Sequence, residues 1–502
     1  MDGALIGLVF VPLLAACLTV LPGTWCARLG VVVGLFALPM LLVPVTLGLW
    51  QTGPQFYEFG GWSPPLGIRL HVDALACVML WMVAIIGGIA AAHAWIDFPP
   101  GSAAGARFWP LWLLLVAAMN ALFLSADLFN LYVCLELVTL AAIPLIAVAG
   151  TPQAIRAAMR YLLLALLASL AYLLGVALFY GSTGTLDMYL PADDPAQRVN
   201  HGVLWIAVAL ISAGLLLKAA VFPLHVWLPA AHSSAPGAVS ALLSALVVKT
   251  AIYLLYRVWL WTVPEAAGSP GSLLLGALGA GALIYGGVAA LIQQRLKLIV
   301  AYSTVAQLGY LMLLFPLAAA PAAGITAWNG ALYQLIAHGL AKAAMFLAAA
   351  NILHAVGSDR LDDLQRLDQR VPINLFALTL AGVSIMGLPP SGGFIAKWLL
   401  LEAAWRAANW TLLVVLIVGS LLAAGYVFRI LAATLRREDP SERDARLPVL
   451  AAVEVHPVQT ACALILALLA LAAGFAAAPL LEFVGRVGAL EGLLPAAGGL
   501  SP

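Results

Sequence analysis

The stretch KAAVFPLHVWLP, residues 218–229, interrupts the apolar run 202–229 and decides how this chain folds. Its prolines lack a helix hydrogen-bond donor and clash with the preceding turn, so one straight helix is excluded there. A similar interruption, GLPPSGG at residues 387–393, splits the apolar run 373–405. Paired interruptions at membrane depth indicate an inverted-repeat transporter, whereas the alternative is that the prolines merely kink two continuous helices. We therefore predict that these two runs are broken helices.

Outward from the two breaks, the chain consists of apolar runs bounded by proline, glycine or charged residues. A helix needs about 20 apolar residues to cross a bilayer, and barrel strands would instead alternate over about ten residues. We therefore expect an all-α polytopic membrane protein with fourteen spans, of which the seventh and twelfth are broken. The spans are expected near residues 4–21, 30–50, 74–96, 109–126, 128–149, 157–180, 202–229, 236–262, 272–292, 299–318, 326–352, 373–405, 409–433 and 457–480.

The composition excludes other classes of protein. Of the 502 residues, 64% are hydrophobic and 9% are charged, where soluble domains carry about 25% charged residues. A net charge of +1 gives no field that would attract nucleic acid. Asp2 stands where a signal peptide needs a positive charge, so the first run is expected to remain as a span. We find no zinc spacing, phosphate loop or flavin, haem or iron–sulfur pattern, and so predict no metal or cofactor and a transporter subunit rather than an enzyme in its own right.

Basic residues predict the orientation, because cytoplasmic loops carry an excess of Lys and Arg. Loops after odd-numbered spans hold thirteen: Arg28, Arg107, Arg156, Arg160, Arg295, Lys297, Arg360, Arg366, Arg370, Arg436, Arg437, Arg443 and Arg446. The opposite side holds five: Arg69, Arg198, Arg257, Arg406 and Arg486. Both termini are therefore expected outside the cytoplasm. The longest polar connections, 353–372 and 434–456, are too short for an appended catalytic domain.

Four of the five lysines, Lys218, Lys249, Lys342 and Lys397, lie inside apolar spans. A charge at the bilayer centre costs about 2.5 to 3.5 kcal/mol on insertion scales, so four of them need a reason. Arginine stays charged in proteins, whereas a buried lysine can release its proton. The alternative is snorkelling of each ammonium to the interface, which the mid-span position of Lys249 disfavours. The pattern therefore predicts a path that passes protons from group to group.

Glu136 is the only acidic residue within the fifth span. A carboxylate at that depth is expected to pair with a cation, and Lys218 is the candidate partner. The pair would act as a switch if loosening it released the lysine proton, or it is a static tie between two helices.

Three histidines lie at or near membrane depth. His338 precedes Lys342 by one helical turn on the same face and is suited to relay a proton, although packing with a hydrogen bond is equally compatible. For His225 and His232, beside the first break, structural hydrogen bonding is the favoured interpretation.

The stretch 218–229, followed by His232, the Ala235-Pro236 pair and Val248-Lys249-Thr250, resembles the antiporter-like membrane subunits shared by respiratory complex I and the multisubunit Mrp cation/proton antiporters. The resemblance continues over nearly the whole chain. It implies fourteen helices with two inverted five-helix repeats, a hydrated polar axis and a bacterial-type inner membrane. The implied divisions are 1–108 for the first three helices, 109–262 and 272–433 for the repeats, and 457–502 for the last helix and tail.

The resemblance also implies roles and partners. Glu136 and Lys218 would form the regulatory pair, Lys249 the central relay, His338 and Lys342 the relay of the second half, and Lys397 the terminal proton-loading group. Lys397 follows the pattern of the D-type Mrp antiporter chain, whereas Ser244 and Gln307 replace histidines of some relatives, which puts a proton role there in doubt.

Three functions stay open at this point. The first is a proton-translocating subunit of a cation/proton antiporter that exchanges Na⁺ or another monovalent cation. The second is a proton-pumping subunit of a complex I-like or hydrogenase redox complex. The third is the membrane subunit of an inorganic-carbon uptake complex with a zinc protein partner. In each case the expected partners are other membrane subunits in the same bilayer.

Overall fold

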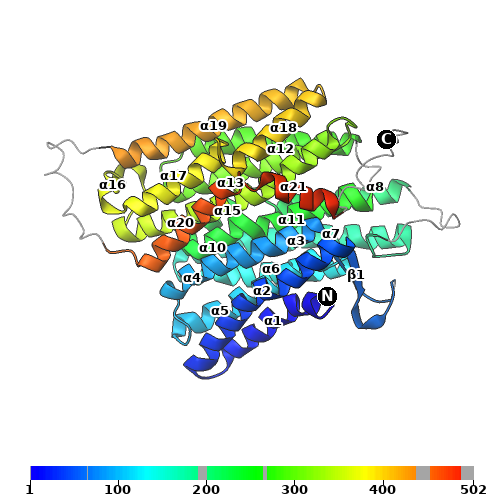
Figure 1. Cartoon of the computed structure of the whole chain (residues 1–502), viewed down its shortest axis with the longest axis horizontal. Helices are drawn as coiled ribbons and strands as arrows, with labels where there is room; N and C mark the ends of the chain where they lie inside the picture. The colour runs from blue at the N-terminus through cyan, green and yellow to red at the C-terminus, as the bar shows by residue number, and fades with distance from the viewer. Residues whose placement is uncertain (1, 65, 190–200, 264–267, 437–452, 488–502) are drawn as a thin grey trace.

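The computed structural model describes residues 2–64, 66–189, 201–263, 268–436 and 453–487. Within these ranges the chain is a bundle of roughly parallel and antiparallel helices (Figure 1). Twelve helices in the described ranges are long and apolar enough to cross a membrane, and a bent pair at the C-terminal end brings this to thirteen. The all-α membrane fold is confirmed, and the twelfth expected span is made of two shorter helices.

The first helices build one side of the bundle and a small hairpin. They are α1 (Asp2–Val20), α2 (Thr24–Thr52), α3 (Ala74–Met82), α4 (Gly88–Asp97), α5 (Ala103–Leu124), α6 (Leu128–Ala147) and α7 (Pro152–Thr183). Between α2 and α3, strands β1 (Gln55–Glu58) and β2 (Arg69–Val72) pair antiparallel, with the 3₁₀ turn η1 (Phe59–Gly61) between them. This hairpin was not predicted because four-residue strands carry little periodicity.

The remaining helices enclose the most deeply buried part of the molecule. They are α8 (His201–Lys218), α9 (Leu228–Ser234), α10 (Gly237–Leu242), α11 (Val248–Arg257), α12 (Pro270–Ile292), α13 (Leu296–Met312), α14 (Leu314–Ala318), α15 (Gly324–Val356), η6 (Leu361–Asp363), α16 (Leu367–Arg370), α17 (Pro372–Met386), α18 (Gly392–Arg406), α19 (Trp410–Leu435), α20 (Pro457–Ala472) and α21 (Ala477–Arg486). Every residue of the 18-residue apolar window within 237–262 is buried, as are 89% of those in the window within 324–356. These two spans form the centre of the bundle.

Both predicted breaks are present. After α8 ends, the backbone turns, and Trp227 Nε1 donates a hydrogen bond to the Leu217 carbonyl at 3.0 Å. The span does not end at residue 229 as expected, because α9 continues it to Ser234. In the second break α17 ends at Met386 and is followed by Gly387, whose φ of 81° lies in the left-handed region that glycine tolerates. Ser391 then caps α18 by accepting a hydrogen bond from the Phe394 N–H.

Three widened π turns interrupt the central helices and were not predicted. They are η2 (Val83–Gly87), η3 (Leu243–Val247) and η4 (Val258–Thr262). Such turns occur within α-helices often at functional sites, and no residue pattern announces them. η3 ends two residues before Lys249, which makes it part of the candidate site below.

The last expected span, 457–480, is shorter than predicted. Helix α20 ends at Ala472 and α21 leaves it at an angle of 72°. Helix α21 returns to the end of α2, where Phe483 stacks on Trp50 at 6.2 Å and Arg486 lies 4.2 Å above the same ring. The beginning of α1, the hairpin and α21 lie toward the same end of the bundle (Figure 1).

Two residues counted as loop cations are instead buried. Arg257 is the last residue of α11 and is fully buried, and Lys297 lies in the first turn of α13 and is 5% exposed. In the sequence a basic residue close to the end of a span cannot be told from a loop residue. In the fold, neighbouring elements bury these two. Four of the counted arginines lie outside the described residues: Arg198, Arg437, Arg443 and Arg446.

Candidate functional site

Glu136 and Lys218 form a buried ion pair between α6 and α8. Lys218 Nζ lies 3.0 Å from Glu136 Oε1 and also donates to Thr139 Oγ1 at 3.1 Å. Thr139 lies one turn after Glu136, so one face of α6 supplies both acceptors. Ser169 of α7 donates a second hydrogen bond to the same carboxylate oxygen. The side chain of Lys218 is 6% exposed and that of Glu136 is 21% exposed, so the carboxylate is the wetter partner.

The first helix break holds this pair in place. Lys218 is the last residue of α8, and the chain after it turns back so that the Trp227 ring stacks on Tyr161 of α7 at 4.0 Å. The break therefore fixes the end of α8 against α7, next to the carboxylate that neutralises the lysine.

Lys249 lies at the centre of the bundle and is fully buried. Its ammonium donates to the carbonyl of Ala245 at 2.7 Å and lies 3.4 Å from that of Ser244. Both carbonyls belong to the widened turn η3. Because a π turn disrupts the regular i→i+4 pattern, it presents carbonyl oxygens that the ammonium can satisfy. No ion pair to Lys249 is present within the described residues.

His338 and Lys342 lie on the same face of α15, as their spacing predicted. Lys342 Nζ donates to Ser303 Oγ of α13 at 2.7 Å and to the Val300 carbonyl. His338 is 2% exposed, and neither ring nitrogen has a hydrogen-bond partner among the described residues. A Cβ placed on Gly339, between the two, would lie 3.4 Å from Lys249 Nζ. The structure therefore brings Lys249, His338 and Lys342 into one cluster.

A polar stripe on α13 lines this cluster, and most of it was missed from the sequence. Thr304 Oγ1 lies 2.9 Å from Ser244 Oγ, which joins α13 to the turn beside Lys249. Gln334 Nε2 donates to Gln307 Oε1 at 2.8 Å, and Gln307 Nε2 lies 3.5 Å from the Tyr426 hydroxyl. The sequence could have predicted this stripe from the spacing of Ser303, Thr304 and Gln307, which places three polar residues on one face of an apolar span.

Lys397 lies at the second helix break. Its ammonium donates to the carbonyls of Ile385 and Met386, at 2.8 and 3.1 Å, which are the carbonyls that the end of α17 leaves without helix partners. The same ammonium lies 4.8 Å above the Tyr310 ring, and the Tyr310 hydroxyl is 3.3 Å from Ser420 Oγ. Lys397 and Ser420 line a cavity of about 300 Å³. The cavity walls are otherwise largely apolar, so Lys397 and Ser420 supply its polar groups.

The six predicted site residues thus fall into three groups. Glu136 and Lys218 form the first, Lys249 with His338 and Lys342 the second, and Lys397 the third. Within the described ranges no direct hydrogen bond joins one group to the next. Beside the second group, Thr304, Gln307 and Gln334 carry side chains that both donate and accept, which is the kind of group that proton transfer through water uses.

A charged cluster at the hairpin end of the bundle was not predicted. Arg257 binds Asp73 through two parallel hydrogen bonds of 2.6 and 2.7 Å, and both residues are buried. Arg69 of β2 pairs with Asp187, which follows α7 in the chain, at 2.7 Å. Burial alone would raise the pKa of Asp73, but Arg257 overrides it and holds this pKa well below its usual range. Burial lowers the pKa of His71 to about 4, although Asp73 opposes the shift.

Comparison with known proteins identifies the family of the chain. Residues 125–423, which include both breaks and all six site residues, match the NADH:quinone oxidoreductase/Mrp antiporter transmembrane family. The chain belongs to this family. It is therefore an antiporter-like membrane subunit of the proton-translocating type, built from the helices described above.

Three relatives show the range of the family. The N-type chain of the NADH-quinone oxidoreductase of Desulforudis audaxviator is 38% identical over 382 residues, which cover 75% of each chain. The D-type chain of the Na⁺/H⁺ antiporter of Alkalihalophilus pseudofirmus is 30% identical over 399 residues, 78% of each chain. A chain in the structure of the Mrp complex from Dietzia sp. DQ12-45-1b superposes with a TM-score of 0.84 at 27% identity and 97% coverage of both chains.

Proposed function

We propose that this chain conducts protons as a membrane subunit of a multisubunit cation/proton antiporter. The observation that carries the proposal is the burial of four lysines inside the bundle, each with its own polar partners, in a part of the chain that matches the proton-translocating family. Four buried ammonium groups are costly to insert, and a lysine can release a proton where an arginine cannot. A proton path gives each of them a use.

The geometry supports a separate role for each group. Glu136 holds Lys218 charged while the pair is closed, and opening the pair leaves Lys218 to give up its proton. Lys249 receives protons at the centre, where the carbonyl oxygens of η3 and the buried ring of His338 lie beside it. Lys342 and His338 carry protons into the second half, and Lys397 exchanges them with one aqueous side of the membrane at the second break.

The exchanged ion and the surrounding complex are part of the proposal. The similarity to the D-type chain of an Na⁺/H⁺ antiporter favours Na⁺ or another monovalent cation as the counter-ion, with other membrane subunits as partners. A second candidate is a proton-pumping subunit of a redox complex, which is favoured by the 38% identity to the N-type chain of an NADH-quinone oxidoreductase. The chains that co-purify from the native membrane distinguish the two: small antiporter subunits, or quinone-reducing subunits that carry iron–sulfur centres.

We also propose the orientation and the division of the chain. The described basic residues at the ends of odd-numbered spans favour a cytoplasmic location for that end of the bundle, with both termini on the other side of a bacterial-type cell membrane. The two breaks favour two five-helix repeats, residues 109–262 and 272–433, with 1–108 and 457–502 as flanking parts.

Lys249 is the residue whose replacement tests the proposed function. We expect Lys249→Ala to abolish proton transport while the complex still assembles, because a relay needs a titratable group at the centre. Lys249→Arg should fail as well, since arginine keeps its proton. The measurement is proton flux by dye quenching in membrane vesicles that contain the whole complex.

The matched control is Val248→Ala, which removes buried atoms from the neighbouring residue of the same helix without removing a titratable group. We expect this variant to transport protons. Wild-type flux in Lys249→Arg would refute the relay.

A further inference from the structure

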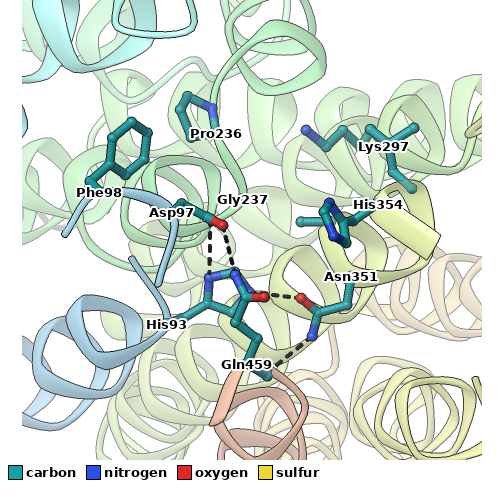
Figure 2. Close-up of a pocket in the computed structure, with 11 residues that line it drawn as sticks. His93, Asp97, Phe98, Pro236, Gly237, Lys297, Asn351, His354 and Gln459 are labelled. Atoms are coloured by element: carbon teal, nitrogen blue, oxygen red, sulfur yellow. Dashed lines mark hydrogen bonds and ion pairs between the residues drawn. The ribbon is translucent and has the colours of Figure 1, made fainter. Parts of the chain in front are cut away.

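A polar cavity of about 310 Å³ opens at the end of the bundle opposite the hairpin, and no residue of the proposed path lines it (Figure 2). Its walls come from the end of α4, the start of α10, the start of α13, the end of α15 and the start of α20. Odd-numbered spans end here and even-numbered spans start here. This is therefore the side of the bundle that the basic residues assign to the cytoplasm.

The cavity contains a connected set of polar side chains (Figure 2). His93 is 1% exposed, with Nε2 2.8 Å from Asn351 Oδ1 and Nδ1 3.8 Å from Asp97 Oδ2. Gln459 Nε2 donates to the other oxygen of Asp97 at 2.8 Å, and the Gln459 carbonyl accepts from Asn351 at 3.1 Å. The Asp97 side chain is 40% exposed. Water at the mouth therefore reaches a carboxylate that contacts a buried histidine.

The floor of this cavity separates it from Lys342 by one layer of side chains. Gly237 and Ala350 meet there so closely that a Cβ on Gly237 would lie 2.3 Å from that of Ala350. One turn further inward, the Phe346 ring lies 5.2 Å from Lys342 Nζ and stacks on His232 at 4.5 Å. The layer between cavity and relay is thus made of Phe346 and His232.

His232 does not have the structural hydrogen bond expected from its place beside the break. It is fully buried, and neither of its ring nitrogens has a hydrogen-bond partner among the described residues. Only its backbone carbonyl is used, as an acceptor for Ser240 at 3.1 Å. An imidazole in the wall between a wet cavity and a buried lysine is suited to pass a proton across that wall.

We propose that this cavity is the cytoplasmic proton-uptake site, in which the Asp97–His93 pair collects protons and His232 passes them to Lys342. The inference rests on the proposed function and adds a route and an uptake group to it. Each transfer moves one proton from a donor nitrogen or carboxylic acid to a neutral nitrogen or carboxylate, with water between them. The charged and titratable groups that face His93 across the cavity are Asp97, Lys297 and His354.

The route is tested by plugging the cavity from one side. The background carries Cys17→Ser and Cys26→Ser, which removes the cysteines outside the buried core. Ala350→Cys places a thiol on the cavity floor, and Gln369→Cys places one on the exposed surface of α16, outside the cavity. A membrane-impermeant anionic methanethiosulfonate is then added to inverted or right-side-out vesicles that contain the whole complex.

We expect the reagent to reduce proton transport at least tenfold in inverted vesicles of Ala350→Cys and to leave Gln369→Cys active although it is modified. In right-side-out vesicles Ala350→Cys should remain active. Complete modification of Ala350→Cys with unchanged transport, or no modification from the cytoplasmic face, would overturn the proposal.

The two transferring groups are tested by their pH dependence. Transport by the wild type should depend on the pH of the cytoplasmic side, and Asp97→Asn should flatten that dependence while leaving the dependence on the opposite side unchanged. His232→Gln should reduce transport at least tenfold without altering modification of Ala350→Cys, whereas His225→Gln, beside the same break, should stay near the wild-type rate. Wild-type transport in His232→Gln would refute the transfer step.

Lys249→Ala, measured in parallel, separates the two proposals. Loss of transport in Lys249→Ala together with an insensitive cavity overturns the uptake route alone. Undiminished transport in Lys249→Ala overturns the proposed function itself.

Discussion

A double-mutant cycle on Glu136 and Lys218 should give a coupling free energy of about 1 to 3 kcal/mol, because losing either partner strands the charge of the other. At the observed 3.0 Å, two unit charges attract by about 5 kcal/mol at an effective dielectric constant of about 20. Desolvation offsets much of this gain, but removing one partner strands the other charge, which costs about 3 to 5 kcal/mol in buried pairs. Because 21% of the Glu136 side chain is exposed, we expect each single variant to lose a free energy of unfolding near the lower end of this range.

The two replacements have different consequences. Glu136→Gln leaves the Lys218 ammonium with neutral acceptors only, the introduced amide oxygen and the Thr139 hydroxyl, and Lys218→Met leaves the carboxylate with Ser169. Each single variant should therefore unfold at lower denaturant or temperature than the wild type. The double variant strands no charge, so it should be more stable than the sum of the single losses predicts, with a coupling energy of about 1 to 3 kcal/mol.

The assay is unfolding of the purified complex, followed for the wild type, both single variants and the double variant. The control is the surface pair Glu402–Arg406, which lies on one exposed face of α18. Its cycle should give about 0.5 kcal/mol or less, because water screens exposed pairs. Additive losses in the Glu136–Lys218 cycle would refute the reasoning. The double variant should also remain inactive in transport, since both switch groups are gone.

Three further outcomes follow from the structure. Lys397→Ala should block net proton flux without preventing assembly of the complex. Lys397→Glu should retain part of the flux if a titratable group suffices at the break. Full flux in vesicles with Lys397→Ala would move the terminal role to Lys342. Replacing Gln334 by Leu should slow transport severalfold at unchanged complex yield, because it removes the 2.8 Å hydrogen bond that orients Gln307, and an unchanged rate would exclude this stripe from the path. His71 takes up a proton only below about pH 4 in the folded protein but near pH 6.5 in the unfolded chain, so the free energy of unfolding should fall by up to about 3 kcal/mol as the pH drops from 6.5 to 4. Thermal unfolding of His71→Phe, which keeps the stacking on Phe56, should show a smaller fall over the same pH range. An equal fall would show that other groups cause it.

Much of the fold was determined by the sequence because a bilayer leaves few choices. Backbone groups in lipid must be satisfied within the segment, so long apolar runs become helices and their approximate positions follow from composition alone. The same constraint made both breaks predictable, since proline cannot continue a helix. It also made the four lysines within apolar spans recognisable as unusual. The spacing of His338 and Lys342 placed them on one face of α15 without reference to any other helix.

Only the tertiary structure decided which distant groups meet. The sequence suggested Lys218 as the partner of Glu136, but Ser169 and Thr139 at the same site depend on how three helices pack. The widened turn that offers its carbonyls to Lys249 follows from no residue pattern, because a π turn uses the same apolar and small residues as an ordinary helix. From the sequence Arg257 was expected in a loop, and only the fold shows that it is buried and bound to Asp73. The cavity beside His93 and Asp97 is formed by the ends of five spans that are far apart in the chain, and only packing brings these ends together.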